Sequence, residues 1–313
     1  MTFRERICPR PFADTSCLLS RAVWWFSVCL ICLSKASLDG AEPTPDFDKI
    51  RHQAQSGDAA ARFLLGKAYL EGNGMTQDPA KAAVLFRQAA EQGDLRAQHN
   101  LGVLYIEGTG VPRDETEGAK WIRKAADQGA AMSQDTLGSL FLRGIGVSRN
   151  PSQAAGWFRK AAEQGSADAQ YQLGRLYYFG DEGFSQDYAE AARWFELAGN
   201  QGNVWAQNSL GLMYQEGFGV EKDMAKAEAL FEKAAERGDA KAQSNLGALY
   251  ALSSNQDRDL PRAFFWLTRS SDQGEGTATR LLIGVRNSMS KKQLVAAKRL
   301  LEQSVSKVHS PTK

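Results

Sequence analysis

The chain has 313 residues, of which 43% are hydrophobic and 24% are charged, and this composition is typical of a folded soluble protein. The formal net charge of +2 excludes a nucleic-acid binder that depends on a global basic field. All four cysteines lie before residue 37. If residues 1–36 are removed, thiol catalysis, Cys-ligated zinc and iron–sulfur clusters are excluded as well.

The N-terminal segment has the pattern of a signal peptide. Arginines precede an apolar run from Ala22 to Leu33, and Ser34-Lys35-Ala36 offers small residues at the positions that a signal peptidase inspects. The run is shorter than the ~20 residues that cross a bilayer. We predict a signal peptide over 1–36 and export to the bacterial periplasm or the medium. The alternatives are an uncleaved membrane anchor or, in a eukaryote, the ER lumen.

After a linker and N-terminal cap over 37–56, the sequence repeats. A leucine–glycine pair returns every 36 residues, with one step of 37, and two further columns share its register. The leucines of the pair are Leu65, Leu101, Leu137, Leu173, Leu210 and Leu246. The second column is Leu85, Trp121, Trp157, Trp194, Leu230 and Trp266, and we expect it to be buried between units. The third column is a pair of alanines, Ala89-Ala90, Ala125-Ala126, Ala161-Ala162 and Ala234-Ala235. Three registered columns predict a repeat array over 57–284, with six full units and a half unit.

Each unit predicts two antiparallel helices. In the second unit Ala97, Leu101 and Tyr105 lie on one face of a first helix. Gly108 is expected to end that helix, because glycine adopts the left-handed conformation without steric cost. Asp114 is expected to cap the second helix through its side chain. Since one such hairpin cannot bury its apolar face alone, we expect the hairpins to stack into a continuous core.

The unit from Ala97 to Gly129 closely resembles the Sel-1-like repeat (SLR) family of tetratricopeptide-like α-solenoids. The resemblance implies an all-α fold, a right-handed α-solenoid of about six and a half two-helix repeats with a concave groove. It also implies an adaptor that binds a protein or peptide partner, with no cofactor, no nucleic acid and no membrane contact beyond the signal peptide. Many bacterial members are exported.

The repeat pattern gives way after Leu282, and residues 285–313 predict a C-terminal capping helix and a basic tail. Ser290 and Gln293 match a capping box at the start of that helix.

One enzymatic alternative has a sequence basis. Ser288 and Lys291 match the Ser-x-x-Lys pattern, and some cysteine-rich exported relatives in this family are described as β-lactam-binding or β-lactamase-like. No Lys-Thr-Gly or Ser-Asp-Asn accompanies the pattern here, and the disulfide pairs of those relatives are absent. We therefore predict that the protein is not an enzyme.

In such a solenoid the first helices line the inner groove, and positions that differ from repeat to repeat are free to specify a ligand. Trp205 is an outlier in a solvent-tolerant column and is a candidate interface anchor. The candidate binding residues are Asn100, Val103, Ser139, Arg143, Gln172, Arg175, Trp205, Leu212 and Asn245. By contrast, a glutamine ladder repeats in the units and is expected to satisfy structural hydrogen bonds. It consists of Gln98, Gln134, Gln170, Gln207 and Gln243.

Overall fold

The computed structural model describes residues 46–252 and 258–309, so the predicted signal peptide lies outside the described residues. Within these ranges the chain forms fifteen α-helices and no strand beyond an isolated bridge between Asp181 and Phe184. The helices are α3 (Phe47–Gln55), α4 (Ala59–Glu71), α5 (Pro79–Glu91), α6 (Leu95–Glu107), α7 (Glu115–Asp127), α8 (Ala131–Arg143), α9 (Pro151–Glu163), α10 (Ala167–Phe179), α11 (Tyr188–Asn200), α12 (Val204–Glu216), α13 (Met224–Glu236), α14 (Ala240–Leu252), α15 (Leu260–Asp272), α16 (Gly276–Ser288) and α17 (Lys291–His309).

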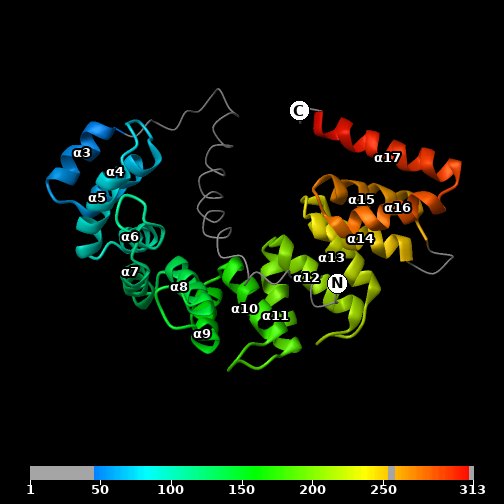
Figure 1. Cartoon of the computed structure of the whole chain (residues 1–313), viewed down its shortest axis with the longest axis horizontal. Helices are drawn as coiled ribbons and strands as arrows, with labels where there is room; N and C mark the ends of the chain where they lie inside the picture. The colour runs from blue at the N-terminus through cyan, green and yellow to red at the C-terminus, as the bar shows by residue number, and fades with distance from the viewer. Residues whose placement is uncertain (1–45, 253–257, 310–313) are drawn as a thin grey trace. The chain divides into compact units, whose positions relative to one another are not determined.

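The helices alternate as first and second helices of successive repeats, which confirms the predicted α-solenoid (Figure 1). The even-numbered helices from α4 to α14 are the first helices, and the odd-numbered helices from α5 to α15 are the second helices. The chain divides into two compact units. The N-terminal unit comprises described residues 46–169 with 181–184, and the C-terminal unit comprises 170–180 with the described residues from 185 onward.

Local capping fixes where the helices begin and end. The Asp114 carboxylate accepts a hydrogen bond from the Glu117 backbone N–H at 2.9 Å, as the sequence predicts. Gly108 ends α6 in the left-handed conformation with φ 74°. Glycine is also required where the helices of a pair cross, because a Cβ on Gly102 would lie 2.8 Å from the Gly118 carbonyl oxygen. Small residues therefore set the close spacing of the two helices.

The centre of the core is the position directly after the tryptophan column. These side chains come from the second helices and all are 0% exposed. They are Phe86, Ile122, Phe158, Phe195, Phe231 and Leu267. The tryptophans cover the flank of this layer. Trp121 and Trp194 are 9% and 6% exposed, whereas Trp157 is only partly buried. The prediction of a uniformly buried column is therefore wrong at Leu85, Trp157 and Leu230, which are only partly buried. The column lies on the flank of the core because neighbouring positions on a helix point about 100° apart.

Two departures from the repeat have local structural solutions. In the lengthened turn of the fourth repeat, Asp181 pairs with Arg149, and the Ser152 hydroxyl donates to the Gly183 carbonyl oxygen at 2.5 Å. At the other end, Ser290 and Gln293 form the predicted capping box, since the Ser290 backbone N–H donates to Gln293 Oε1 at 2.9 Å.

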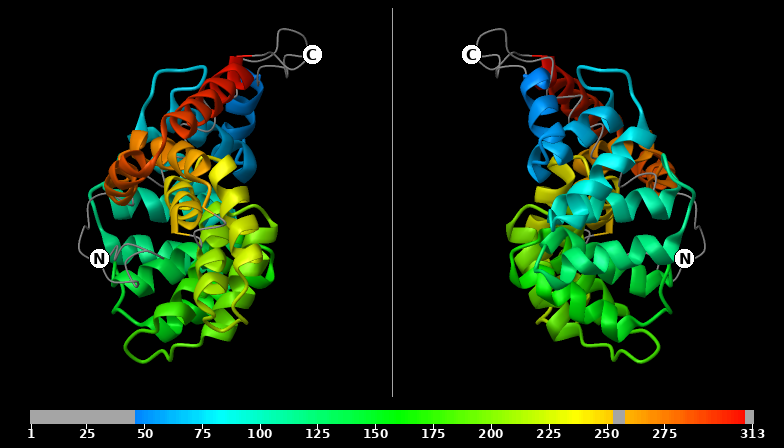
Figure 2. Two further views of the ribbon diagram at one scale, coloured as in Figure 1. Left: turned by 90° about the vertical axis from the view of Figure 1, so that its right-hand side faces the viewer. Right: turned by 90° about the vertical axis from the view of Figure 1, so that its left-hand side faces the viewer.

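The last helix covers the end of the array. α17 packs against α15 in the C-terminal unit, as the red and orange ribbons in Figures 1 and 2 show. Across residues 46–252 and 258–309, no helix is both long enough and apolar enough to cross a membrane.

Candidate protein-binding face

Most of the predicted binding residues lie partly exposed on the first helices. In the N-terminal unit, Asn100 and Val103 lie on α6, and Ser139 and Arg143 lie on α8. In the C-terminal unit the corresponding residues are Gln172 and Arg175 on α10, Trp205 and Leu212 on α12, and Asn245 on α14. We call this side of the first helices the first-helix face.

Leu212 corrects the prediction. Its side chain is 1% exposed and belongs to the hydrophobic core of the C-terminal unit. The equivalent residues of the other repeats, such as Val103 and Arg175, are only partly buried. A leucine at this position turns into the core because burial removes its apolar surface from water. Leu212 is therefore unavailable to a ligand.

An aromatic cluster lies on the face of the C-terminal unit. Trp205 is 48% exposed, and its ring centroid lies 5.9 Å from that of Tyr171 on the preceding first helix. The Arg175 guanidinium lies 5.7 Å from the Tyr171 ring centroid and donates from Nη1 to Gln172 Oε1 at 3.0 Å. Three predicted residues thus lie close together beside Tyr171, which the prediction did not include. Their arrangement offers an indole, a cation and an amide on one surface.

An amide pair continues this face on the next two first helices. Asn245 donates from Nδ2 to Asn208 Oδ1 at 2.8 Å, so α14 and α12 are linked side chain to side chain. Asn208 is only 3% exposed, whereas Asn245 is partly exposed. The predicted residue Asn245 is therefore held in place by a buried neighbour.

The face of the N-terminal unit carries two titratable groups that the prediction did not include. His99 on α6 lies 3.1 Å from the Ser133 hydroxyl on α8, and burial lowers the pKa of His99 to about 4. Burial, with a smaller contribution from the Asp168 charge, raises the pKa of Asp135 to about 7. Asp135 Oδ1 is buried and has no hydrogen-bond partner in the part of the chain that the structure describes. Both side chains occupy the same position of successive repeats.

Arg143 lies at the C-terminal end of α8. Burial lowers the pKa of its guanidinium, and the opposing effect of the Glu115 charge is smaller. Arg143 is thus a partly desolvated cation on the first-helix face.

The glutamine ladder is structural, as predicted. Gln98 donates from Nε2 to the Ala90 carbonyl oxygen at 3.1 Å, and Gln134 bonds Ala126 in the same way. Gln98 Oε1 in turn accepts from Gln128 at 3.0 Å. The ladder therefore links the end of each second helix to the next first helix, and it is not part of the binding face.

The motifs of the enzymatic alternative gain no support. Ser288 ends α16 with an exposed side chain, and its hydroxyl donates to the Gly284 carbonyl oxygen at 3.0 Å. Among the described side chains, no group of three or more His, Cys, Asp or Glu could hold a metal ion.

The architecture defines an α-solenoid of stacked helix pairs, with a repeating core and a variable first-helix face. The family model of the Sel1 repeat matches six times, over residues 59–94, 95–129, 131–166, 167–203, 206–239 and 240–275. The chain therefore belongs to the Sel1 repeat family.

Solved structures agree with this assignment. The chain is similar to a protective antigen present in uropathogenic Escherichia coli strains that displays an SLR fold, with 31% identity and a TM-score of 0.74. That match covers 91% of this chain and 63% of the antigen. A Sel1 repeat protein from Oxalobacter formigenes is 30% identical with a TM-score of 0.63, over 73% of this chain and 100% of that protein. No curated protein matches the sequence.

Proposed function

We propose that the protein is an exported, non-catalytic scaffold that binds a peptide or protein segment on the first-helix face. Sel1 repeat proteins are generally protein–protein interaction scaffolds. The observation that carries the proposal is the cluster around Tyr171, where Trp205 is 48% exposed although the residues that follow it, 206–210, are buried. A large aromatic side chain on a preformed surface is typical of an interface anchor, because little entropy is lost on binding.

The test compares two exposed residues at equivalent repeat positions. A peptide library displayed on phage is selected against the full chain, and affinities of the selected peptides are measured by calorimetry. Trp205→Ala should weaken binding about tenfold, as loss of an anchor does. Met132→Ala, which removes a side chain that is 57% exposed at the same position of the N-terminal unit, should have a smaller effect.

The assignment of the face has its own control. Lys233 is exposed on the second helix α13, and Lys233→Glu should leave peptide affinity unchanged. If Lys233→Glu abolishes binding while Trp205→Ala binds like the wild type, the partner lies on the second helices and the proposal is wrong.

The exported location rests on the N-terminal pattern alone. Mass spectrometry of the protein from its own cells should find an N-terminus near Ser37. An intact segment 1–36 in the membrane fraction would favour the anchor instead.

A further inference from the structure

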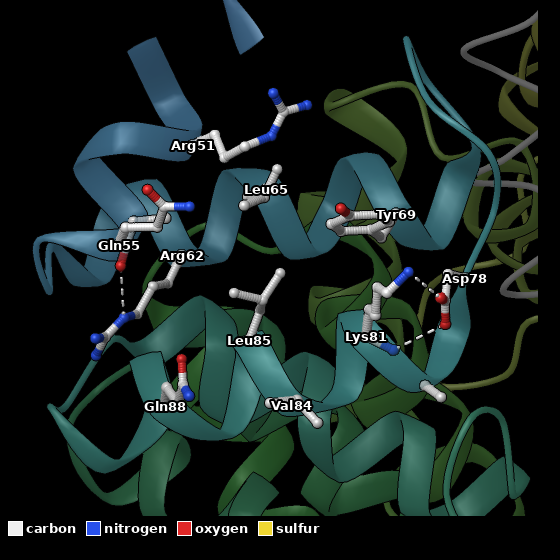
Figure 3. Close-up of a pocket in the computed structure, with 12 residues that line it drawn as sticks. Arg51, Gln55, Arg62, Leu65, Tyr69, Asp78, Lys81, Val84, Leu85 and Gln88 are labelled. Atoms are coloured by element: carbon white, nitrogen blue, oxygen red, sulfur yellow. Dashed lines mark hydrogen bonds and ion pairs between the residues drawn. The ribbon is translucent and has the colours of Figure 1, made fainter. Parts of the chain in front are cut away.

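The first repeat contains an open groove, and none of the residues that define the first-helix face lines it. It measures about 680 Å³ and is lined by residues of α3, α4 and α5 (Figure 3). Leu65, Tyr69, Val84 and Leu85 supply its apolar lining. The cations that line it are Arg51 of α3, Arg62 of α4 and Lys81 of α5.

The first repeat lacks a tryptophan in the column that lines this groove. Leu85 stands at the position where the second, third, fourth and sixth repeats carry Trp121, Trp157, Trp194 and Trp266. In the second repeat Trp121 is 9% exposed and packs in one cluster with Leu101, the equivalent of Leu65. Leucine is smaller than tryptophan by most of an indole ring. The neighbouring Val84 is 55% exposed, at a position that is exposed in other repeats as well, and here it adds apolar surface to the groove.

A second departure places positive charge beside this space. Arg62 stands where the ladder carries Gln98, and it keeps the structural hydrogen bond of that position. Arg62 Nε donates to the Ala54 carbonyl oxygen at 3.1 Å, just as Gln98 donates to Ala90 at 3.1 Å. The arginine therefore adds a charge without changing the bond that the fold requires.

The other two cations already have partners. Lys81 Nζ lies 2.9 Å from Asp78, and Arg51 Nη1 lies 2.7 Å from Asp48. Asp78 is the only acidic residue that lines the groove, and the described lining therefore carries a net positive charge. Lys226 and Arg262 repeat the positive charge of Lys81 in the fifth and sixth repeats. Every later repeat of the ladder has glutamine at the position of Arg62, so the charge of Arg62 is specific to the first repeat.

We propose that this groove binds a partner protein through an aromatic side chain that has a carboxylate beside it in the sequence. The ring occupies the space that a tryptophan of the chain fills in other repeats, and it lies against Leu65, Leu85 and Tyr69. The carboxylate pairs with the Arg62 guanidinium, since a charge-assisted hydrogen bond to arginine is strong and directional. Shape and charge thus select the same ligand.

The probe is the fluorescein-labelled hexapeptide Gly-Asp-Trp-Glu-Asp-Gly, titrated against the full chain by fluorescence anisotropy. Two further peptides replace either Trp by Ala or all acids by their amides. Leu85→Trp should weaken binding of the first peptide at least tenfold, because the chain's own indole fills the groove. Thermal stability should be equal to that of the wild type or higher, since four repeats carry tryptophan there.

The matched control is Leu230→Trp. Leu230 occupies the same position in the fifth repeat, where Gln207 and Glu196 replace Arg62 and Arg51. Leu230→Trp should leave the affinity for the first peptide unchanged. Arg62→Gln should weaken that peptide about fivefold and leave the amide peptide unaffected, because glutamine preserves the bond to Ala54.

Each outcome decides the proposal. Loss of binding in Leu85→Trp but not in Leu230→Trp supports the groove. Equal affinity of wild type and Leu85→Trp overturns it, as does equal weakening by both tryptophan variants. Trp205→Ala should bind the peptide like the wild type. The proposal for the groove can therefore fail independently of the proposal for the first-helix face.

Discussion

The core-facing positions of the second helices and the variable positions of the first helices differ in how strictly the residue is repeated. On the inward side each repeat places a large apolar residue that is 0% exposed, such as Phe158 or Phe195. On the first helices one repeat position holds His99, Asp135 and Tyr171 in successive repeats, and these residues share neither size nor charge. Both regions belong to the same 36-residue register. Repetition therefore marks where burial dictates the residue, and variation marks where stability leaves the choice open.

The largest expected effect on the free energy of unfolding concerns the buried layer of the second helices. Phe158→Ala should lower the free energy of unfolding by about 3–5 kcal/mol, because it leaves a cavity in a fully buried layer. Trp157→Ala should cost less, about 1–2 kcal/mol, since its ring is partly exposed and lies 3.8 Å from the Lys160 ammonium group. Urea unfolding followed by circular dichroism measures both. An equal loss in the two variants would place the tryptophan in the core centre.

The second prediction concerns the variable positions of the first helices. Asp135 should destabilise the folded protein at neutral and higher pH. Its pKa is raised from 3.8 to about 7 in the folded protein, chiefly by burial. Below pH 3.8 both states are protonated. Between pH 3.8 and about 7 the Asp135 carboxyl holds its proton in the folded state but not in the unfolded state. The free energy of unfolding therefore falls as pH rises through this range.

Asp135→Asn cannot titrate and tests this directly. We expect Asp135→Asn to exceed the wild type in stability by about 1–2 kcal/mol at pH 8, with the difference vanishing near pH 4. His99, whose pKa is lowered to about 4, has the opposite pH dependence. It is present in both proteins and cancels in the comparison. A pH-independent difference in melting temperature would contradict the assignment.

Much of this organisation can be predicted from sequence, because caps, glycine turns and the repeat period each have a local physical cause. Asp114, Gly108 and the capping box of Ser290 with Gln293 all behave as predicted. The period alone could not decide whether Trp157 or Phe158 points inward, because both are large and apolar.

The candidate site could be predicted only in part. Variation between repeats correctly singled out Trp205 as exposed, but it also included the buried Leu212. Nor could it show that Tyr171 unites Trp205 with Arg175, since that contact joins two helices. The groove of the first repeat did leave a signal, which is the coincidence of Leu85 and Arg62 in two otherwise regular columns.

The smallest expected effect on the free energy of unfolding concerns the glutamine ladder. Gln134 and Gln243 each accept a hydrogen bond at Oε1, from Gln164 at 2.7 Å and from Gln273 at 2.8 Å. Gln207 Oε1 is buried and has no partner among the described residues, because Arg237 stands where the donor glutamine should be. Arg237 instead donates from Nη1 to the Gly202 carbonyl oxygen at 2.7 Å.

Two opposite substitutions, Arg237→Gln and Gln164→Arg, isolate the contribution of one buried hydrogen-bond acceptor. Arg237→Gln should raise the free energy of unfolding by about 1 kcal/mol, because it restores a donor to Gln207. Gln164→Arg should lower it by a similar amount, because it leaves Gln134 Oε1 unpaired. Differential scanning calorimetry of the two variants against the wild type measures both changes. If Gln164→Arg destabilises while Arg237→Gln gains nothing, the Arg237 bond to Gly202 contributes as much as the missing glutamine pair, and the ladder tolerates the exchange at the fifth repeat without loss.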